Sequence, residues 1–371
     1  MRVVCVAGAR PNFMKIAPVL GALDAAGADT VLVHTGQHYD EAMSQVFFEE
    51  LDLRKPDEHL GVGSGSHAEQ TARVMVAFET LLAKLAADVV VVVGDVNSTL
   101  ACSIVAAKGG LLVAHVEAGL RSRDWAMPEE VNRVVTDRVS DYLFAPSADA
   151  VENLRAEGYR DDQIHLVGNV MVDTLLHNVE RARTRGLPPQ LALQPKKYAL
   201  LTLHRPSNVD DPVVLARLFG AVGEVARQIP VVFPAHPRTR ERMRGLEIPA
   251  GVVVTDPLGY LDFLVLQADA ALVLTDSGGI QEETTALGVA CLTLRESTER
   301  PITVSEGTNR LVGTDPAAII AAARTALRGE VEARCPALWD GFAAPRIARV
   351  IMEGGTADDR LRPTDLPERR S

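Results

Sequence analysis

The stretch LTDSGGIQEETTALGVACLTLRESTERPITVSEGTNRLVG, residues 274–313, decides the fold class of this 371-residue chain. An apolar strand ends at Thr275, a turn of Ser277, Gly278 and Gly279 follows, and a helix then leads into a second apolar strand. This order is the repeating unit of a parallel α/β sheet. Backbone N–H groups at a helix start face an anion, and the two glycines let a ligand approach the main chain without a Cβ in the way. The segment therefore predicts an α/β fold with a phosphate site at this turn.

Apolar runs rich in Val, Ile and Leu recur on both sides of this segment, with longer amphipathic stretches between them. They predict strands at 3–7, 30–35, 89–93, 112–116, 142–145 and 164–167, and again at 198–203, 231–235, 252–255, 271–275, 290–294 and 310–312. Two sets of this kind predict two doubly wound, Rossmann-like domains, covering residues 1–168 and 169–340. The join is expected near 168–197, where residues 186–197, GLPPQLALQPKK, have the composition of a linker. Residues 354–371 lack apolar periodicity and are expected to form a flexible tail.

Composition limits the class of protein. Hydrophobic residues make up 47% and charged residues 23%, as in ordinary globular proteins. The net charge of -11 argues against nucleic acid or an anionic membrane as the main partner. Cys5, Cys102, Cys291 and Cys335 lie far apart, which predicts reduced thiols, buried for the first three. With no leader sequence and no apolar run approaching about 18 residues, we expect a soluble, cytoplasmic protein.

Basic residues at the first helix are candidates for binding an anion. In an open α/β sheet, ligands bind at the carboxyl ends of the strands. The polar residues that follow the strands form one row in each domain, and we expect both rows to face one interdomain cleft. Arg10 and Lys15 follow the first strand, where a guanidinium and an ammonium at a helix start suit a diphosphate. The alternative for Lys15 is a solvated helix residue.

Carboxylates after the next strands are candidates for acid and base. Asp95 follows a run of five valines, so it either caps the following helix or takes part in proton transfer. Glu117 follows another strand with no capping role evident. Glu129 opens a helix after Pro128, where the helix dipole favours an acid in any case. Several carboxylates in one cleft can have their pKa values pushed apart, which supplies both an acid and a base.

The positions of the histidines and glycines limit which ligands and metals the chain is expected to bind. His204 lies where a strand breaks into a loop, and it either contacts a phosphate, shares in proton transfer or is structural. The chain has no metal-binding spacing of His and Cys, and we expect no metal. The first turn, Ala7 to Arg10, lacks the glycine triplet of a dinucleotide site, which argues against NAD. We expect no cofactor.

Taken together, the motifs resemble those of the UDP-N-acetylglucosamine 2-epimerase family. They are GARPNFMKIAPV, TGQHYDEAM, VVVVGDVNSTLA, HVEAGLRS, MPEEVNR, DYLFAPS, VGNVMVD, LTLHRPSN, FPAHPRTR and LTDSGGIQEE with TERPITVSEGTNRLVG, in order over residues 2–351. The resemblance implies a glycosyltransferase-B architecture, with UDP held mainly by the second domain and a last helix, about 341–353, packing back on the first. It also implies a homodimer and a UDP-sugar substrate.

The non-hydrolysing members of that family interconvert UDP-N-acetylglucosamine and UDP-N-acetylmannosamine, by eliminating UDP to a 2-acetamidoglucal and adding it back. By motif position the resemblance assigns catalysis to Asp95, Glu117, Glu129 and His204. It assigns the UDP-sugar to Arg10, Lys15, Ser277, Gly278, Gly279, Glu283, Arg300 and Arg310, with Glu283 at the ribose. Ser64 and Gly65 stand where activated members carry Arg and Gln, so we expect weak or absent allosteric activation.

Other functions stay open at the level of sequence. A hydrolysing 2-epimerase, which releases UDP and N-acetylmannosamine, uses nearly the same site. A 2-epimerase of a UDP-2,3-diacetamido uronate would need a further basic residue near the sugar, and Arg123 is the candidate. A glycosyltransferase of the same fold does not need a base at C2, so the three carboxylates argue against it. Intact carboxylates also argue against an inactive UDP-sugar-binding protein.

Overall fold

The computed structural model describes residues 1–36 and 50–354, which form two compact units. The first is Met1–Val170 with a returning segment that begins at Phe342, and the second is Met171–Gly341. The expected tail after residue 354, and the polar pair Gln37 and His38 that follows the second strand, lie outside the described residues. Among the residues described, no helix has both the length and the apolarity needed to cross a bilayer.

The first unit is built on a parallel sheet of seven strands in the order β3-β2-β1-β4-β5-β6-β7. Its strands are β1 (Arg2–Ala7), β2 (Asp29–His34), β3 (Glu58–His59), β4 (Val89–Val93), β5 (Leu112–Val116), β6 (Tyr142–Ala145) and β7 (Ile164–Leu166). Its helices are α1 (Arg10–Ala25), α3 (His67–Leu82), α4 (Asn97–Lys108), α5 (Pro128–Val139), α6 (Ala148–Ala156) and α16 (Ala343–Glu353). The strand order reverses between β1 and β4, and such a switch point is where open α/β sheets bind ligands.

The second unit repeats this plan with six parallel strands in the order β10-β9-β8-β11-β12-β13. They are β8 (Ala199–Thr202), β9 (Val231–Pro234), β10 (Val252–Thr255), β11 (Leu272–Thr275), β12 (Ala290–Thr293) and β13 (Asn309–Leu311). The helices are α7 (Val170–Arg183), α8 (Leu187–Gln190), α9 (Pro206–Val209), α10 (Pro212–Ala226), α11 (Pro237–Arg242), α12 (Tyr260–Ala268), α13 (Gly278–Ala286), α14 (Ile302–Ser305) and α15 (Pro316–Leu327). Here the order reverses between β8 and β11.

Alternation along each strand divides the core between the two faces of the sheet. On β8, Leu201 packs on the side of α10 and α15, whereas Leu200 packs on the side of α8 and α12. Both faces are therefore covered, which explains why these strands read as continuous apolar runs. The predicted strands are all present, within two residues at their ends. The two-residue edge strand β3 was not predicted, because Glu58 and His59 are polar and exposed.

The segment predicted to be a linker, residues 186–197, is packed instead. Gly186 precedes the short helix α8, and Leu187, Leu191 and Leu193 contact the core of the second unit. The prediction was wrong because the prolines of this segment indicated a break, while its leucines are spaced to cover one face of the sheet.

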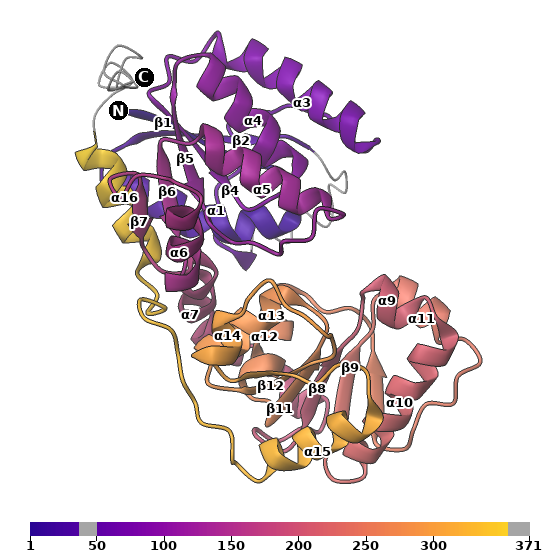
Figure 1. Cartoon of the computed structure of the whole chain (residues 1–371). Coiled ribbons are helices and arrows are strands. Elements are labelled where there is room, and N and C mark those ends of the chain that lie inside the picture. Colours follow the sequence, from indigo (N-terminus) through magenta and orange to yellow (C-terminus); the bar gives the residue numbers. More distant parts are fainter. Residues whose placement is uncertain (37–49, 355–371) are drawn as a thin grey trace, which may run out of the picture. The chain divides into compact units, whose positions relative to one another are not determined.

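Helix α16 belongs to the first unit although it follows the whole of the second in sequence (Figure 1). Ala343, Ala344, Ile347, Ala348 and Ile351 are buried along one face, and the helix packs against α1. The end of the chain thus closes the core of the domain in which the chain begins.

We predict that Ile347→Ala lowers the free energy of unfolding of the first unit by about 3 kcal/mol, because it empties a fully buried site. Arg349→Ala, on the exposed face of the same helix, should change it by less than about 0.5 kcal/mol. Amide hydrogen exchange measures both. Faster exchange confined to residues 171–341 in the Ile347→Ala variant would contradict the assignment of α16 to the first unit.

Candidate active site

A buried ion pair lies at the carboxyl end of the first sheet. Lys15, on α1, donates to Glu117, which directly follows β5, and their side chains are 11% and 4% exposed. The alternative that Lys15 is a solvated helix residue is therefore wrong. Glu117 has φ of 73°, a conformation that costs a residue with a side chain about 1–3 kcal/mol. Its Oε1 is buried without a hydrogen-bond partner among the described residues. A strained residue with an unused oxygen is typical of a functional site.

Gly94 brings Asp95 next to this pair. It follows β4 with φ of 66°, and a Cβ at this position would lie 2.9 Å from Nζ of Lys15 and 3.6 Å from Oε2 of Glu117. Only glycine therefore fits between β4 and the ion pair. The close approach places the turn that carries Asp95 directly against the Lys15–Glu117 pair.

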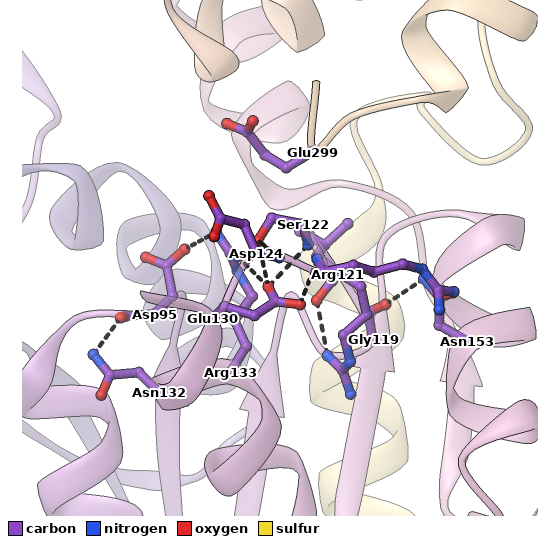
Figure 2. A network of polar contacts seen from close by, with 12 residues as sticks. Asp95, Gly119, Arg121, Ser122, Asp124, Glu130, Asn132, Arg133, Asn153 and Glu299 are labelled. Carbon is purple, nitrogen blue, oxygen red and sulfur yellow. Dashed lines mark hydrogen bonds and ion pairs between the residues drawn. The ribbon is translucent and has the colours of Figure 1, made fainter. Parts of the chain in front are cut away.

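Asp95 is held by α5 and does not cap α4. The N-cap of α4 is Val96, without a side-chain hydrogen bond, so the capping interpretation is wrong. Instead, Arg133 Nη2 donates to Asp95 Oδ2 at 2.6 Å, and Asn132 Nδ2 donates to the Asp95 carbonyl at 2.8 Å (Figure 2). The carboxylate is 23% exposed, so it remains open to a ligand while its charge is compensated.

The two acids at the start of α5 have different environments. Glu130 is buried and accepts from the backbone of Ser122 and Arg123 at 2.9 and 2.8 Å, and from Arg133 Nη1 at 2.8 Å (Figure 2). It therefore fixes the loop that joins β5 to α5. Glu129 is half-buried and lines the same pocket, of about 340 Å³, as Asp95. The other lining residues are Ser64, Gly65, His67, Gln70, Val96, Asn97, Pro128 and Asn132.

A buried histidine ties the three carboxylate-bearing segments together. His115, on β5, contacts Asp137 Oδ1 on α5 at 2.6 Å through Nδ1, and the Gly94 carbonyl at 2.9 Å through Nε2. Both partners have acceptor oxygens, so each ring nitrogen lies where an N–H can donate. Burial opposes ionisation of Asp137, but His115 and Arg121 lower its pKa below its usual range. His115 thus links the turn before Asp95, the strand before Glu117 and the helix that carries Glu129.

The second unit has a similar arrangement at its own switch point. Asp276 follows β11, is completely buried, and accepts from the backbone N–H groups of His204 and Arg205 and from Asn208 Nδ2 at 3.0–3.2 Å. His204 Nδ1 lies 2.8 Å from Asp276 Oδ1. Burial opposes the charged form of Asp276, yet these hydrogen bonds lower its pKa. The His204 side chain is 55% exposed, which leaves Nε2 for a ligand.

The Ser-Gly-Gly turn forms the start of α13. Ser277 is the N-cap and its side chain makes no capping hydrogen bond, so the first backbone N–H groups remain for an anion. A Cβ on Gly279 would meet open space, whereas one on Gly278 would lie 2.5 Å from Oε1 of Glu299. The need for glycine at position 278 therefore comes from Glu299.

Three further residues assigned by motif differ in their surroundings. Glu283, on α13, is buried, and burial raises its pKa to about 7, with a further contribution from Glu282. Arg300 is buried and its Nε lies 2.9 Å from Glu282. Arg310 is exposed on β13, and its neighbour Asn309 faces α13, so alternation directs Arg310 to the other face of the sheet. The described contacts therefore do not connect Arg310 with the turn.

Some residues of these two groups were not predicted. Arg133, His115, Asp137 and Glu299 hold or neighbour the predicted residues, and Asp276 was not among the residues to which a role was assigned. A signal existed for Arg133, since it lies four positions after Glu129 and three after Glu130 on one helix. Asp276 follows a buried strand as Asp95 does.

No metal-binding group of three or more His, Cys, Asp or Glu side chains occurs in the part of the chain that the structure describes.

Comparison with known proteins agrees with the resemblance. A family model described as UDP-N-acetylglucosamine 2-epimerase matches residues 22–352. A protein of that name from Methanocaldococcus jannaschii is 41% identical over 366 residues, covering 95% of this chain and 100% of the relative. UDP-2,3-diacetamido-2,3-dideoxy-D-glucuronate 2-epimerase from Pseudomonas aeruginosa is also 41% identical, over 357 residues, covering 95% and 100%.

Solved structures show the same fold. The Methanocaldococcus jannaschii UDP-GlcNAc 2-epimerase, in complex with UDP-GlcNAc and UDP, has a TM-score of 0.85 at 41% identity, covering 95% of this chain and 100% of the other. A lipopolysaccharide outer core galactosyltransferase, at 14% identity and a TM-score of 0.55 over 95% of this chain and 99% of the other, shows the fold alone. The predicted fold class is thus confirmed, and the chain belongs to the UDP-N-acetylglucosamine 2-epimerase family.

Proposed function

We propose that this protein interconverts UDP-N-acetylglucosamine and UDP-N-acetylmannosamine without net hydrolysis. The observation that carries the proposal is the group of three carboxylates at one edge of the first sheet. Asp95 and Glu129 line one pocket, and Gly94 places Asp95 against the Glu117–Lys15 pair. Epimerisation at C2 needs a base on one face of the sugar and an acid on the other, and several carboxylates at one site can supply both.

The proposed reaction is an elimination followed by an addition. A carboxylate takes the C2 proton, the electron pair forms the C1–C2 double bond, and the C1–oxygen bond breaks to release UDP. UDP then adds back to C1 of the 2-acetamidoglucal while a second group delivers a proton to the opposite face of C2. The start of α13 and His204 are proposed to stabilise the negative charge on the departing diphosphate, while Lys15 compensates the charge of Glu117. Arg10 stays a candidate on the strength of its motif alone, because its side chain lies outside the described part of the structure.

The second unit supplies the proposed UDP site. Gly278 and Gly279 offer backbone N–H groups to the phosphates and Ser277 offers its hydroxyl, because the Ser277 N–H already donates to Thr275 Oγ1. Glu283, one turn further along α13, accepts from the ribose hydroxyls. Arg300 acts by pairing with Glu282, whereas Arg310 remains a candidate on the strength of its motif alone.

A second candidate substrate is a UDP-2,3-diacetamido uronate, because the Pseudomonas aeruginosa relative is as similar as the N-acetylglucosamine epimerase. The uronate needs a cation for its carboxylate. Arg123 donates to Asn153 Oδ1 at 2.9 Å and lines a different pocket from the one that contains Asp95 and Glu129. This position favours the neutral sugar.

The expected cytoplasmic location, the homodimer and a role in supplying a mannosamine donor for a polysaccharide or a secondary-metabolite sugar stay predictions. So does the expectation of weak or absent allosteric activation. Ser64 and Gly65 line the pocket that contains Asp95, and neither of them supplies a cation to it.

Proton NMR in deuterated buffer tests the reaction. With UDP-N-acetylglucosamine, we expect UDP-N-acetylmannosamine to appear with deuterium at C2, because the proton is lost to a group that exchanges with solvent. Free N-acetylmannosamine with UDP would instead establish the hydrolysing reaction. No exchange with this substrate, but exchange with the uronate sugar nucleotide, would transfer the function to the second candidate.

Replacing each carboxylate with its amide should lower kcat by about 10²–10⁴-fold, because an amide cannot accept or deliver the proton. The variants are Asp95→Asn, Glu117→Gln and Glu129→Gln. Glu152→Gln, an exposed acid on α6, is the matched control and should retain full activity. A Glu129→Gln variant with normal kcat would remove Glu129 from the proposed catalytic group.

The affinity for UDP-N-acetylglucosamine should rise with pH between about 6 and 8, if Glu283 accepts from the ribose. Burial raises the pKa of Glu283 to about 7, so the carboxyl group is mostly protonated at pH 6 and must lose its proton to accept two hydroxyls. Binding at pH 6 should be about tenfold weaker than at pH 8 and should release close to one proton.

Calorimetry in buffers of different ionisation enthalpy measures this release, in the Asp95→Asn background to prevent turnover. The diphosphate of a UDP-sugar carries no proton that titrates in this range, so it does not contribute. Glu283→Gln should abolish the pH dependence. An affinity that instead falls as the pH rises would point to a titrating histidine and count against the ribose role of Glu283.

A further inference from the structure

The carboxylate of Glu299 lies buried between two arginines of the second unit. Its Oε2 is 2.9 Å from Arg295 Nη2, its Oε1 is 3.4 Å from Arg205 Nη2, and its side chain is 8% exposed. Burial opposes ionisation, but the charge of Arg300 and the hydrogen bond from Arg295 lower the pKa of Glu299 to about 2. Glu299 is therefore an anion at every pH at which the protein would work.

This anion lies at the start of α13. The same Oε1 that faces Arg205 would be 2.5 Å from a Cβ on Gly278, the first residue of the helix. A helix N-terminus favours a negative charge. Glu299 thus lies beside the helix start that the proposed function gives to the phosphates of UDP, and it pairs with two arginines as a phosphate group would.

Arg295 still has donor capacity that the described residues do not use. Its Nη1 is buried and has no hydrogen-bond partner among them, although the neighbouring Nη2 is bonded to Glu299. A buried guanidinium nitrogen without an acceptor is unfavourable, because it has lost its hydrogen bonds to water without replacement. The site therefore stabilises a ligand with more acceptor oxygens than one carboxylate has.

The charges at this site indicate whether the Glu299 carboxylate stays or is displaced when the diphosphate binds. Arg205 and Arg295 carry two positive charges. Arg300, whose charge also acts on Glu299, is already paired with Glu282 at 2.9 Å, as His204 is with Asp276 at 2.8 Å. The diphosphate of a UDP-sugar carries two negative charges. With Glu299 in place the two arginines retain one positive charge, too little for the diphosphate, and without it the charges match.

We propose that Glu299 occupies the diphosphate subsite as an internal anion and that the diphosphate displaces it. This inference rests on the proposed function of the Ser-Gly-Gly turn. The exchange keeps Arg205 and Arg295 paired before and after binding, so neither charge is left uncompensated. Breaking the ion pairs of Glu299 costs free energy, so the exchange also weakens UDP binding and favours release of the nucleotide. Glu299 is in this sense a residue that sets affinity and takes no part in proton transfer.

The test compares UDP affinity by calorimetry at pH 8 in the full-length protein. Glu299→Gln removes the competing charge, and we expect it to bind UDP about tenfold more tightly than the wild type. Arg295→Gln should bind about tenfold more weakly, because it removes a phosphate ligand. Glu296→Gln removes the same charge from an exposed residue three positions earlier, and should change the affinity less than twofold.

Opposite results would separate this inference from the proposed function. Weaker UDP binding by a folded Glu299→Gln protein would show that Glu299 stays and positions the arginines, and would overturn the displacement alone. A wild-type protein that binds neither UDP nor inorganic pyrophosphate would overturn both. If Glu299→Gln does not fold, a crystal structure of the wild type with UDP decides. A phosphate in place of the carboxylate on Arg295 supports the displacement, and a carboxylate still bonded to both arginines refutes it.

Discussion

A carboxylate with no exposure to water must find its hydrogen bonds inside the protein, and the second unit is organised by that requirement at Asp276. The residue follows β11 at the switch point of the sheet. Its oxygens are reached by two backbone N–H groups of the loop after β8, by Asn208 and by His204. The loop after β8 is thereby bound to the strand that leads into the Ser-Gly-Gly turn. The histidine and the helix start are consequently fixed with respect to one another.

The first unit meets the same requirement at a second buried aspartate, which lies on a helix and not after a strand. This residue, Asp137, is equally buried, and its two oxygens are contacted by His115 on the strand and by Arg121 in the loop that follows it. The second ring nitrogen of His115 then holds the Gly94 carbonyl, so the buried pair determines where the turn before Asp95 begins. In each unit a fully buried aspartate therefore fixes the segments that present the candidate catalytic groups.

Much of this could be predicted from the sequence, for a physical reason. Strands buried on both faces are continuous apolar runs, so their positions and the residues that follow them can be located, and Asp95, Glu117, His204 and the turn at Ser277 were found in this way. What a carboxylate contacts depends on helices that pack later. The sequence near Asp95 indicates a cap for α4, and only the packing of α5 brings Arg133 to it. The same holds for Glu299, whose partners Arg205 and Arg295 come from two different loops.

Several features of the site are unfavourable for stability. Glu117 has a left-handed backbone and an unpaired oxygen, and Glu283 is a buried acid whose raised pKa means that the fold prefers it neutral. For Glu283 this preference stabilises the fold below pH 4.5 and is lost as the pH rises from there to about 7, so at neutral pH the fold must hold a charge that it disfavours. Ribose hydroxyls would supply the hydrogen bonds that the ionised form lacks. Glu299 is the opposite case, because its charge is already compensated by arginines that the diphosphate would need. One residue thus gains from the ligand while the other gives way to it, so the two have opposite effects on the affinity for a UDP-sugar.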